Sequence, residues 1–425
     1  MPHANALRGL LATAVVWPAA ALAQPATQQV SPPVAQVWID LGTSTGMAGM
    51  GAMMGMDGSP MAALGSLFGG GSNAKNAFGH TRTDPPGRWM DVTLATRANP
   101  TLAQATHSVP DGSGLAPTLQ LVSPRTQKAP PPERDDEEPD EGREEPRGKF
   151  SLYWGCGEAV RPGQPRTVDL AKTPLHAAGA ELAQVLKGRR ATQRGAHAAV
   201  GRPAWPNQQD ARMLPAQATL VGEHAFAGSG VPDGLRFRLP AAQDLMPPLA
   251  IAQTEAGGAT RLGWTALPHA RAYFLMAMGQ KDGEEAHMVI WTSSELPDSG
   301  FGLLDYQTNA AVDRWLRDKV LLAPTVTECA VPRGIFAAGG AMLRAIAYGS
   351  ELNLAQPPRP TDPKVAWEPQ WAVKVRVKST TMAMLGVDVG GEDRQRPPDA
   401  EAPPAEDKPR LLPKASDLLR GILGR

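Results

Sequence analysis

Residues 260–275 read TRLGWTALPHARAYFL, and this stretch carries the most specific structural signal in the chain. Apolar and polar residues alternate on both sides of Pro268, which is typical of two short strands joined by a turn. Trp264 and Tyr273 occupy positions from which their rings would pack inward. The stretch therefore predicts two strands, a short turn between them and a shared aromatic core.

The same alternation recurs far from this stretch on both sides. Period-two hydrophobicity indicates a strand with one buried face. It is found at Val37–Leu41, Met90–Leu94, Leu235–Leu239 and Trp371–Val377. Residues 309–322 differ, because their apolar side chains follow a helical stripe that ends before Pro324. The chain is therefore predicted to be mainly β with one short helical insertion.

Five residues of the opening stretch follow the pattern L-x-W-x-x-x-P-x-A-x-x-Y. They are Leu262, Trp264, Pro268, Ala270 and Tyr273. In this pattern residues 257–380 resemble fibronectin type III domains, in which it spans strands B and C. The resemblance implies an immunoglobulin-like β-sandwich, from which the helix at 309–322 departs. The whole chain also resembles uncharacterised exported bacterial proteins that share a WGCGE-like segment, here residues 154–158, and that likeness implies compartment and fold only.

Composition divides the chain into two predicted β-sandwich domains with polar segments between and after them. Glycine-rich and acidic, proline-rich runs do not bury enough apolar surface to form regular structure. The predicted divisions are an N-terminal β domain at 30–173, a Gly/Met-rich loop inside it at 46–71, an acidic linker at 130–147, a linker at 174–215, a fibronectin type III-like domain at 216–380 and a disordered tail at 381–425.

The first 23 residues have the three parts of a secretory signal. Arg8 is their only charged residue, residues 10–21 are apolar, and Ala21-Leu22-Ala23 provides a small-x-small cleavage site. The apolar part is too short to cross a bilayer. We therefore expect cleavage after Ala23 and a periplasmic or secreted mature chain without a transmembrane span.

The chain has two cysteines, Cys156 and Cys329. Export would place both in an oxidising compartment, where they could form a disulfide that ties the two predicted domains together. Two separate buried thiols are the alternative. The sequence does not choose between them, because a bond requires the two Cα atoms to lie within reach of each other.

Few patterns in the chain point to chemistry. Lys+Arg and Asp+Glu both number 42, so no basic field is expected to attract nucleic acid. Residues 42–46, GTSTG, match G-x-S-x-G, but a nucleophile elbow also needs a helix directly after the serine, and here a Gly/Met stretch follows. A hydrolase with Ser44 as nucleophile stays an alternative, and we assign no catalytic or cofactor-binding residue.

The Gly/Met-rich loop raises a second possibility. Thioethers are soft ligands that suit Cu(I), and export would place them where copper is handled. The candidate ligands are Met47, Met50, Met53, Met54 and Met56. The competing interpretation is an adhesive apolar loop without a metal.

Fold and compartment together favour a non-enzymatic binding or structural module of the cell envelope, because sandwich domains present edges and end loops to partners. The expected partner is another envelope protein or a surface polymer. A copper-binding periplasmic protein and a hydrolase are the alternatives.

Overall fold

The computed structural model describes residues 28–46, 78–125 and 148–386, apart from positions 171, 173, 174, 194, 282, 283 and 338–340. Strands far outnumber helices in these residues, so the predicted mainly β fold class is confirmed. The predicted leader at 1–23, nearly all of the Gly/Met-rich loop, the acidic linker and the tail after residue 386 lie outside the described residues.

The strands form one sheet of 14 strands and a second sheet of three. The elements up to residue 243 are β1 (Ala35–Gly46), α3 (His80–Thr83), β2 (Gly87–Thr96), β3 (Gln104–Ser108), η1 (Asp111–Ser113), β4 (Thr118–Val122), β5 (Lys149–Trp154), β6 (Arg166–Asp169), α4 (Leu175–Val185), β7 (Ala204–Trp205), β8 (Gly222–Gly228), β9 (Arg236–Leu239) and η2 (Ala241–Gln243). The later elements are β10 (Ala252–Ala256), β11 (Ala259–Gly263), β12 (Ala272–Lys281), β13 (Glu284–Thr292), η3 (Phe301–Leu303), α5 (Asn309–Arg317), β14 (Glu328–Val331), β15 (Ala341–Tyr348), β16 (Leu352–Gln356) and β17 (Trp371–Leu385).

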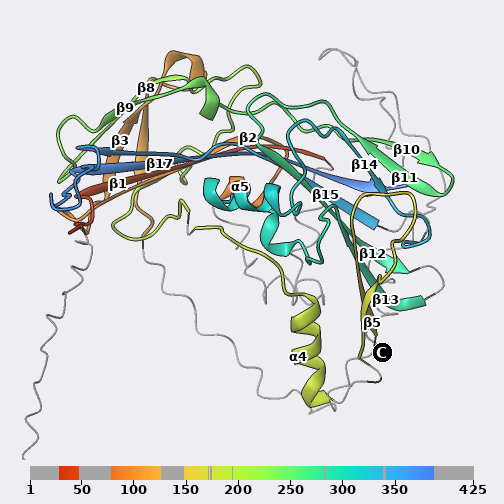
Figure 1. Ribbon diagram of the computed structural model, residues 1–425. Helices are drawn as coiled ribbons and strands as arrows, with labels where there is room; N and C mark the ends of the chain where they lie inside the picture. The colour runs from red at the N-terminus through yellow and green to blue at the C-terminus, as the bar shows by residue number, and fades with distance from the viewer. Residues whose placement is uncertain are drawn as a thin grey trace, which may run out of the picture.

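Strand order in the large sheet is β6-β5-β13-β12-β15-β17-β1-β2-β7-β4-β3-β8-β9, and β16 also pairs with β17. The small sheet has the order β10-β11-β14. The long strands β1 and β17 run side by side through the middle of the molecule (Figure 1). Strands β3, β8 and β9 lie at one end of them, and β12, β13 and β5 lie at the other (Figure 1).

The register of the central strands follows from their alternating sequence. Val37, Ile39 and Leu41 of β1 point into the main core and are almost inaccessible to solvent. On one side they lie beside three valines of β17, and on the other beside three apolar residues of β2. A shift by one residue would turn these side chains to the opposite face, so burial fixes the register.

The strands of the two predicted domains share this large sheet. β1, from the predicted domain at 30–173, pairs along its whole length with β17 of the predicted domain at 216–380. β5 of the first pairs in parallel with β13 of the second. One core cluster accordingly contains side chains from both. The boundary therefore does not separate the strands, because hydrophobic alternation identifies a strand without identifying its neighbour.

The predicted linker at 174–215 is also part of the folded body. It contains α4 and the two-residue strand β7, which enters the large sheet between β2 and β4. Trp205 of β7 is fully buried in the main core. The residues around the buried Trp205 have too little hydrophobic periodicity for this contribution to be predicted from the sequence.

The predicted end of the domain at 216–380 lies too early, because β17 continues past residue 380 to Leu385.

Residues 260–275 contribute to the two predicted strands, which are β11 and β12. Trp264 and Tyr273 are both buried, with ring centroids 5.4 Å apart. The Leu267 amide donates a hydrogen bond to the Tyr273 hydroxyl at 2.7 Å and so fixes the turn. The two strands do not pair with each other, because β11 belongs to the small sheet and β12 to the large one.

The predicted helix at 309–322 is confirmed as α5, which ends earlier, at Arg317. Thr308 caps it by accepting a hydrogen bond from the Ala311 amide. Val312 and Trp315 pack with Phe274 on the face of the large sheet that lies opposite the main core. In the part of the chain that the structure describes, no helix has both the length and the apolar character needed to cross a membrane.

Candidate functional site

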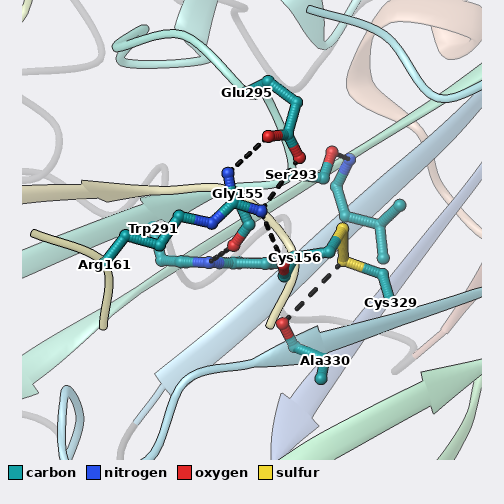
Figure 2. The surroundings of a disulfide bond; sticks show 9 residues. Gly155, Cys156, Arg161, Trp291, Ser293, Glu295, Cys329 and Ala330 are labelled. Atoms are coloured by element: carbon teal, nitrogen blue, oxygen red, sulfur yellow. Dashed lines mark hydrogen bonds and ion pairs between the residues drawn. A yellow bond between two sulfur atoms is a disulfide. The ribbon is translucent and has the colours of Figure 1, made fainter. Parts of the chain in front are cut away.

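The two cysteines form a disulfide that connects the two sheets. Cys156 follows β5 of the large sheet, Cys329 lies in β14 of the small sheet, and their Cα atoms are 5.1 Å apart. Around the bond, the Trp291 indole donates a hydrogen bond to the Gly155 carbonyl at 3.0 Å (Figure 2). Arg161 donates to the Cys156 carbonyl at 2.8 Å and also pairs with Glu295. The Cys156 end of the bond is thus held by further contacts.

A row of charged side chains crosses the centre of the large sheet on the face opposite the main core. The register places Asp40 of β1 between Asp91 of β2 and Arg376 of β17. The Arg376 guanidinium donates two hydrogen bonds to the Asp40 carboxylate, at 2.7 and 2.6 Å. Burial alone would lower the pKa of Arg376, but the Asp40 carboxylate raises it. The result is a buried, bidentate ion pair.

A second buried cation follows two residues later on β17. Lys378 places its ammonium 3.0 Å from Asp84 and 3.5 Å from Asp305. Burial acts to raise the pKa of Asp305, but Lys378 and Arg376 outweigh it and lower the pKa. The Tyr306 ring lies over both cations, 4.4 Å from the Arg376 guanidinium and 4.9 Å from the Lys378 ammonium. Cations and ring therefore form one buried layer.

Asp91 holds the segment before β2 against the sheet. Its carboxylate accepts hydrogen bonds from the amides of Gly79 and Thr81, at 2.9 and 3.0 Å, and from the Thr81 hydroxyl at 2.5 Å. Complete burial raises the pKa of Asp91 to about 6, although these hydrogen bonds lower it. The neighbouring Asp40 carboxylate adds a smaller upward shift of the pKa.

The charged side chains at the centre of the sheet pair with one another and are buried. The side chains of Arg376, Asp40 and Lys378 are 3%, 1% and 1% exposed. A group that reacts with a substrate must be able to touch it. The central charges therefore act as a structural layer that holds residues 79–84 and 301–306 over the sheet.

Two histidines form a second buried polar group, at the end of the sheet that contains β3 and β8. His224 Nε2 lies 2.8 Å from the Leu220 carbonyl and must donate to it, so His224 Nδ1 accepts from His107 Nε2 at 2.9 Å. His107 Nδ1 is buried and has no hydrogen-bond partner among the described residues. Phe226 stacks on His107 with ring centroids 4.1 Å apart. Burial lowers the pKa of both histidines, and that of His107 further because of His224.

The residues proposed from sequence motifs have different outcomes. Ser44 lies within β1, opposite Gly87 and Thr380, and its hydroxyl donates to the Asp84 carbonyl at 2.8 Å rather than to a histidine. This position lacks the strand-to-helix turn of a nucleophile elbow. The copper candidates Met47, Met50, Met53, Met54 and Met56 lie outside the described residues. Within the described residues, no cluster of three or more His, Cys, Asp or Glu side chains could hold a metal.

One surface of the large sheet is open and hollowed. Strand β9 ends the sheet, and β3, β8 and β9 turn one face outward there. A groove of about 340 Å³ lies on it, lined partly by Thr106, Ser108, Ala225, Ala227 and Arg236. The exposed side chains of Arg236 and Arg238 follow β9 on the same face. We call Thr106, Ser108, Ala225, Ala227, Arg236 and Arg238 the β9 face.

The buried charges at the centre of the sheet are not predicted from the sequence, although the alternating pattern of β17 contains both cations, Arg376 and Lys378. Asp40 and Arg376 are 336 positions apart, so no local pattern pairs them. A usable signal was present: each lies on the polar face of a strand whose other face is strongly apolar. Two such strands with opposite charges are candidates for direct pairing.

Removal of the disulfide should destabilise the chain. We expect Cys156→Ala combined with Cys329→Ala to lower the free energy of unfolding by about 2–4 kcal/mol, because the bond constrains the unfolded chain. Urea unfolding followed by tryptophan fluorescence measures this change. Dithiothreitol should reproduce the loss in the wild type and leave the double variant unchanged; a reagent effect of equal size in both would contradict the prediction.

Arg376→Met should destabilise the chain by about 3–5 kcal/mol, because Asp40 would stay buried without its counter-ion. Combining it with Asp40→Leu should restore part of that loss, since neither charge then remains. Arg261→Met is the matched control, because Arg261 pairs with Glu158 at an exposed site and should change the stability little. Equal losses of stability in Arg376→Met and Arg261→Met would show that the buried pair matters no more than the exposed pair, which would contradict the prediction.

The histidine pair predicts a loss of stability in acid. Burial lowers the pKa of His107 and His224, so the unfolded chain binds more protons below pH 6.5 and the free energy of unfolding should fall as the pH drops from 7 to 5. Each histidine contributes at most about 1.4 kcal/mol per pH unit. Asp91, with a raised pKa, has the opposite slope between about pH 4 and 6.

The comparison that isolates the histidines is the slope of stability against pH in His107→Phe/His224→Phe and in the wild type. Asp91 is present in both proteins, so its contribution cancels. The double variant should have the shallower dependence between pH 7 and 5. Identical slopes would mean that the pair does not titrate differently in the folded and unfolded states.

No protein-family model matches the sequence, and a search of curated proteins finds no match.

Proposed function

We propose that this chain is an exported, non-enzymatic binding or structural module of the cell envelope. The observation that carries the proposal is the β9 face, an open sheet surface that combines a groove of about 340 Å³ with two exposed arginines on the edge strand. Edges and hollows of a rigid β scaffold are common places for partner binding. The expected partner is another envelope protein or a surface polymer.

The Cys156–Cys329 bond supports export. Disulfides persist in oxidising compartments and are rare in the cytosol. The leader-like residues 1–23 support the same compartment, with cleavage after Ala23. A periplasmic or secreted location is therefore part of the proposal.

We further propose that residues 257–380 are a fibronectin type III-like unit. Two features support this assignment. The strands β11 and β12 flank the Trp264–Tyr273 pair and lie in different sheets, as strands B and C do in immunoglobulin-type sandwiches. Strands β12, β15 and β17 are adjacent in that order, as C, F and G are. Helix α5, between β13 and β14, departs from this architecture as an insertion.

The alternatives receive less support. The Ser44 hydroxyl donates to the Asp84 carbonyl instead of to a histidine, so the hydrolase has no contact in its favour. The methionines of the copper alternative lie outside the described residues, so that alternative rests on the sequence pattern alone. A binding surface needs neither a nucleophile nor a metal.

Site-specific photocrosslinking in the native cells tests the binding function. We expect benzoylphenylalanine at Thr106 or Ala227, on the β9 face, to yield a discrete adduct of higher mass in the envelope fraction. The control position is Val365, which is 48% exposed and lies outside the groove. Crosslinks of equal yield from all three positions, or a chain that stays in the cytosol, would contradict the proposal.

A further inference from the structure

We propose that β9 is a docking strand for an extended, acidic segment of a protein partner, which adds to the edge of the large sheet. This inference rests on the proposed binding function and specifies the partner's chemistry. Addition of a strand to a sheet edge supplies main-chain hydrogen bonds, while alternate side chains provide specificity.

The backbone of β9 has hydrogen-bonding groups available for such a strand. The Phe226 amide donates to the Leu235 carbonyl at 2.9 Å, and the same antiparallel register pairs His224 with Phe237 and Gly222 with Leu239. Hydrogen-bonded pairs alternate along an antiparallel ladder, so the amides and carbonyls of the residues between them point away from β8. These residues are Arg236 and Arg238.

The outward edge is not covered by another strand in the described part of the chain. β9 is the last strand in the sheet order, and no described segment donates to or accepts from the backbone of Arg236 or Arg238 on that side. Two residues with free backbone groups can hold a short strand of four to six residues by about four hydrogen bonds.

The side chains of the same two residues select acidic partners. Arg236 and Arg238 are exposed, and neither forms an ion pair with another described residue. An added strand places two of its side chains directly opposite them, with Cβ atoms about 5 Å apart. Two exposed acids lie near the arginines: Glu223 of β8 is directly opposite Arg238, and Asp233 lines the groove before β9 begins. Glu223 is about two strand spacings, or 10 Å, from the added strand, whereas Arg236 and Arg238 lie on the strand next to it and are the charges that it meets directly.

The arginines also disfavour a second copy of the chain as the occupant. If β9 paired antiparallel with another β9 about Phe237, Arg236 of each copy would face Arg238 of the other. Like charges directly opposite one another are destabilising, and charged edges are a common protection against self-association. The small residues of the β9 face, Thr106, Ala225 and Ala227, leave room for the side chains of a different chain.

Fluorescence anisotropy with short capped peptides and the full chain tests this inference. The labelled peptide GTEVETG carries glutamates at alternate positions, and GTKVKTG and GTQVQTG are its matched controls. We expect the glutamate peptide to bind about fivefold to tenfold more tightly than the glutamine peptide, the scale of two exposed ion pairs. The lysine peptide should bind most weakly, and 0.5 M salt should reduce the differences.

Two variants separate charge from backbone pairing. Arg236→Glu/Arg238→Glu should reverse the preference so that the lysine peptide binds most tightly, whereas Arg333→Glu, at an exposed arginine beyond β14, should leave it unchanged. Arg238→Pro removes the outward amide without touching a bond to β8, so it should weaken binding about threefold more than Arg238→Gln does. Circular dichroism and the Tm verify that each variant is folded.

Equal binding of the three peptides, or an unchanged glutamate preference after charge reversal, would overturn the inference. If the β9 face gives specific crosslinks in cells but binds no peptide, the binding function stands and strand addition by an acidic segment is wrong. If crosslinking also fails, both are wrong.

Discussion

The parallel pairing of β1 with β17 is the contact on which the rest of this fold depends. It places the first and last described strands in the centre of the large sheet, with β15, β12, β13, β5 and β6 on one side and β2, β7, β4, β3, β8 and β9 on the other. On one side β15 pairs with β17, and on the other side β2 pairs with β1, so each outer group of strands joins the central pair through a single strand. The two groups therefore share one core instead of building separate ones, and stability is expected to be cooperative along the sheet.

The same register that aligns the apolar side chains on one face aligns charges on the other. Asp40 cannot meet Arg376 unless Ile39 also meets Val375, because neighbouring residues on a strand point to opposite faces. A buried ion pair contributes little net stability against an apolar alternative, yet a misaligned one is costly. Its benefit here is discrimination: any slipped register would leave a buried charge unpaired as well as turn valines away from the core.

The strands can be predicted from the sequence, but the neighbours of each strand in the sheets cannot. The alternation in Leu235–Leu239 and Trp371–Val377 predicted strands that exist, because period two reflects a buried face whatever the partner is. The Trp264–Tyr273 unit is predicted from the proline turn between two alternating runs, and the helix at 309–322 from its apolar stripe and from Pro324. The sheet order depends on contacts between distant positions, which no local window contains. This explains why two domains are predicted although strands of both share the large sheet.

The same difference between local patterns and distant contacts decides which parts of the candidate sites are predictable. The arginines of β9 were visible as the polar half of an alternating strand, whereas their place at an open edge follows only from the strand order. The possible disulfide was named, but its formation depended on how the chain folds around Trp291. The histidine pair had no signal at all, because its two members are single residues 117 positions apart.

The position of β17 has a consequence for biosynthesis. Asp40 must wait for a partner that is translated 336 positions later, which at ordinary elongation rates of roughly 5–20 residues per second is about 17–70 s. Until then the nascent polypeptide lacks the central pair formed by β1 and β17. A topology that pairs β1 with β17 therefore postpones closure of the large sheet until most of its other strands have been made.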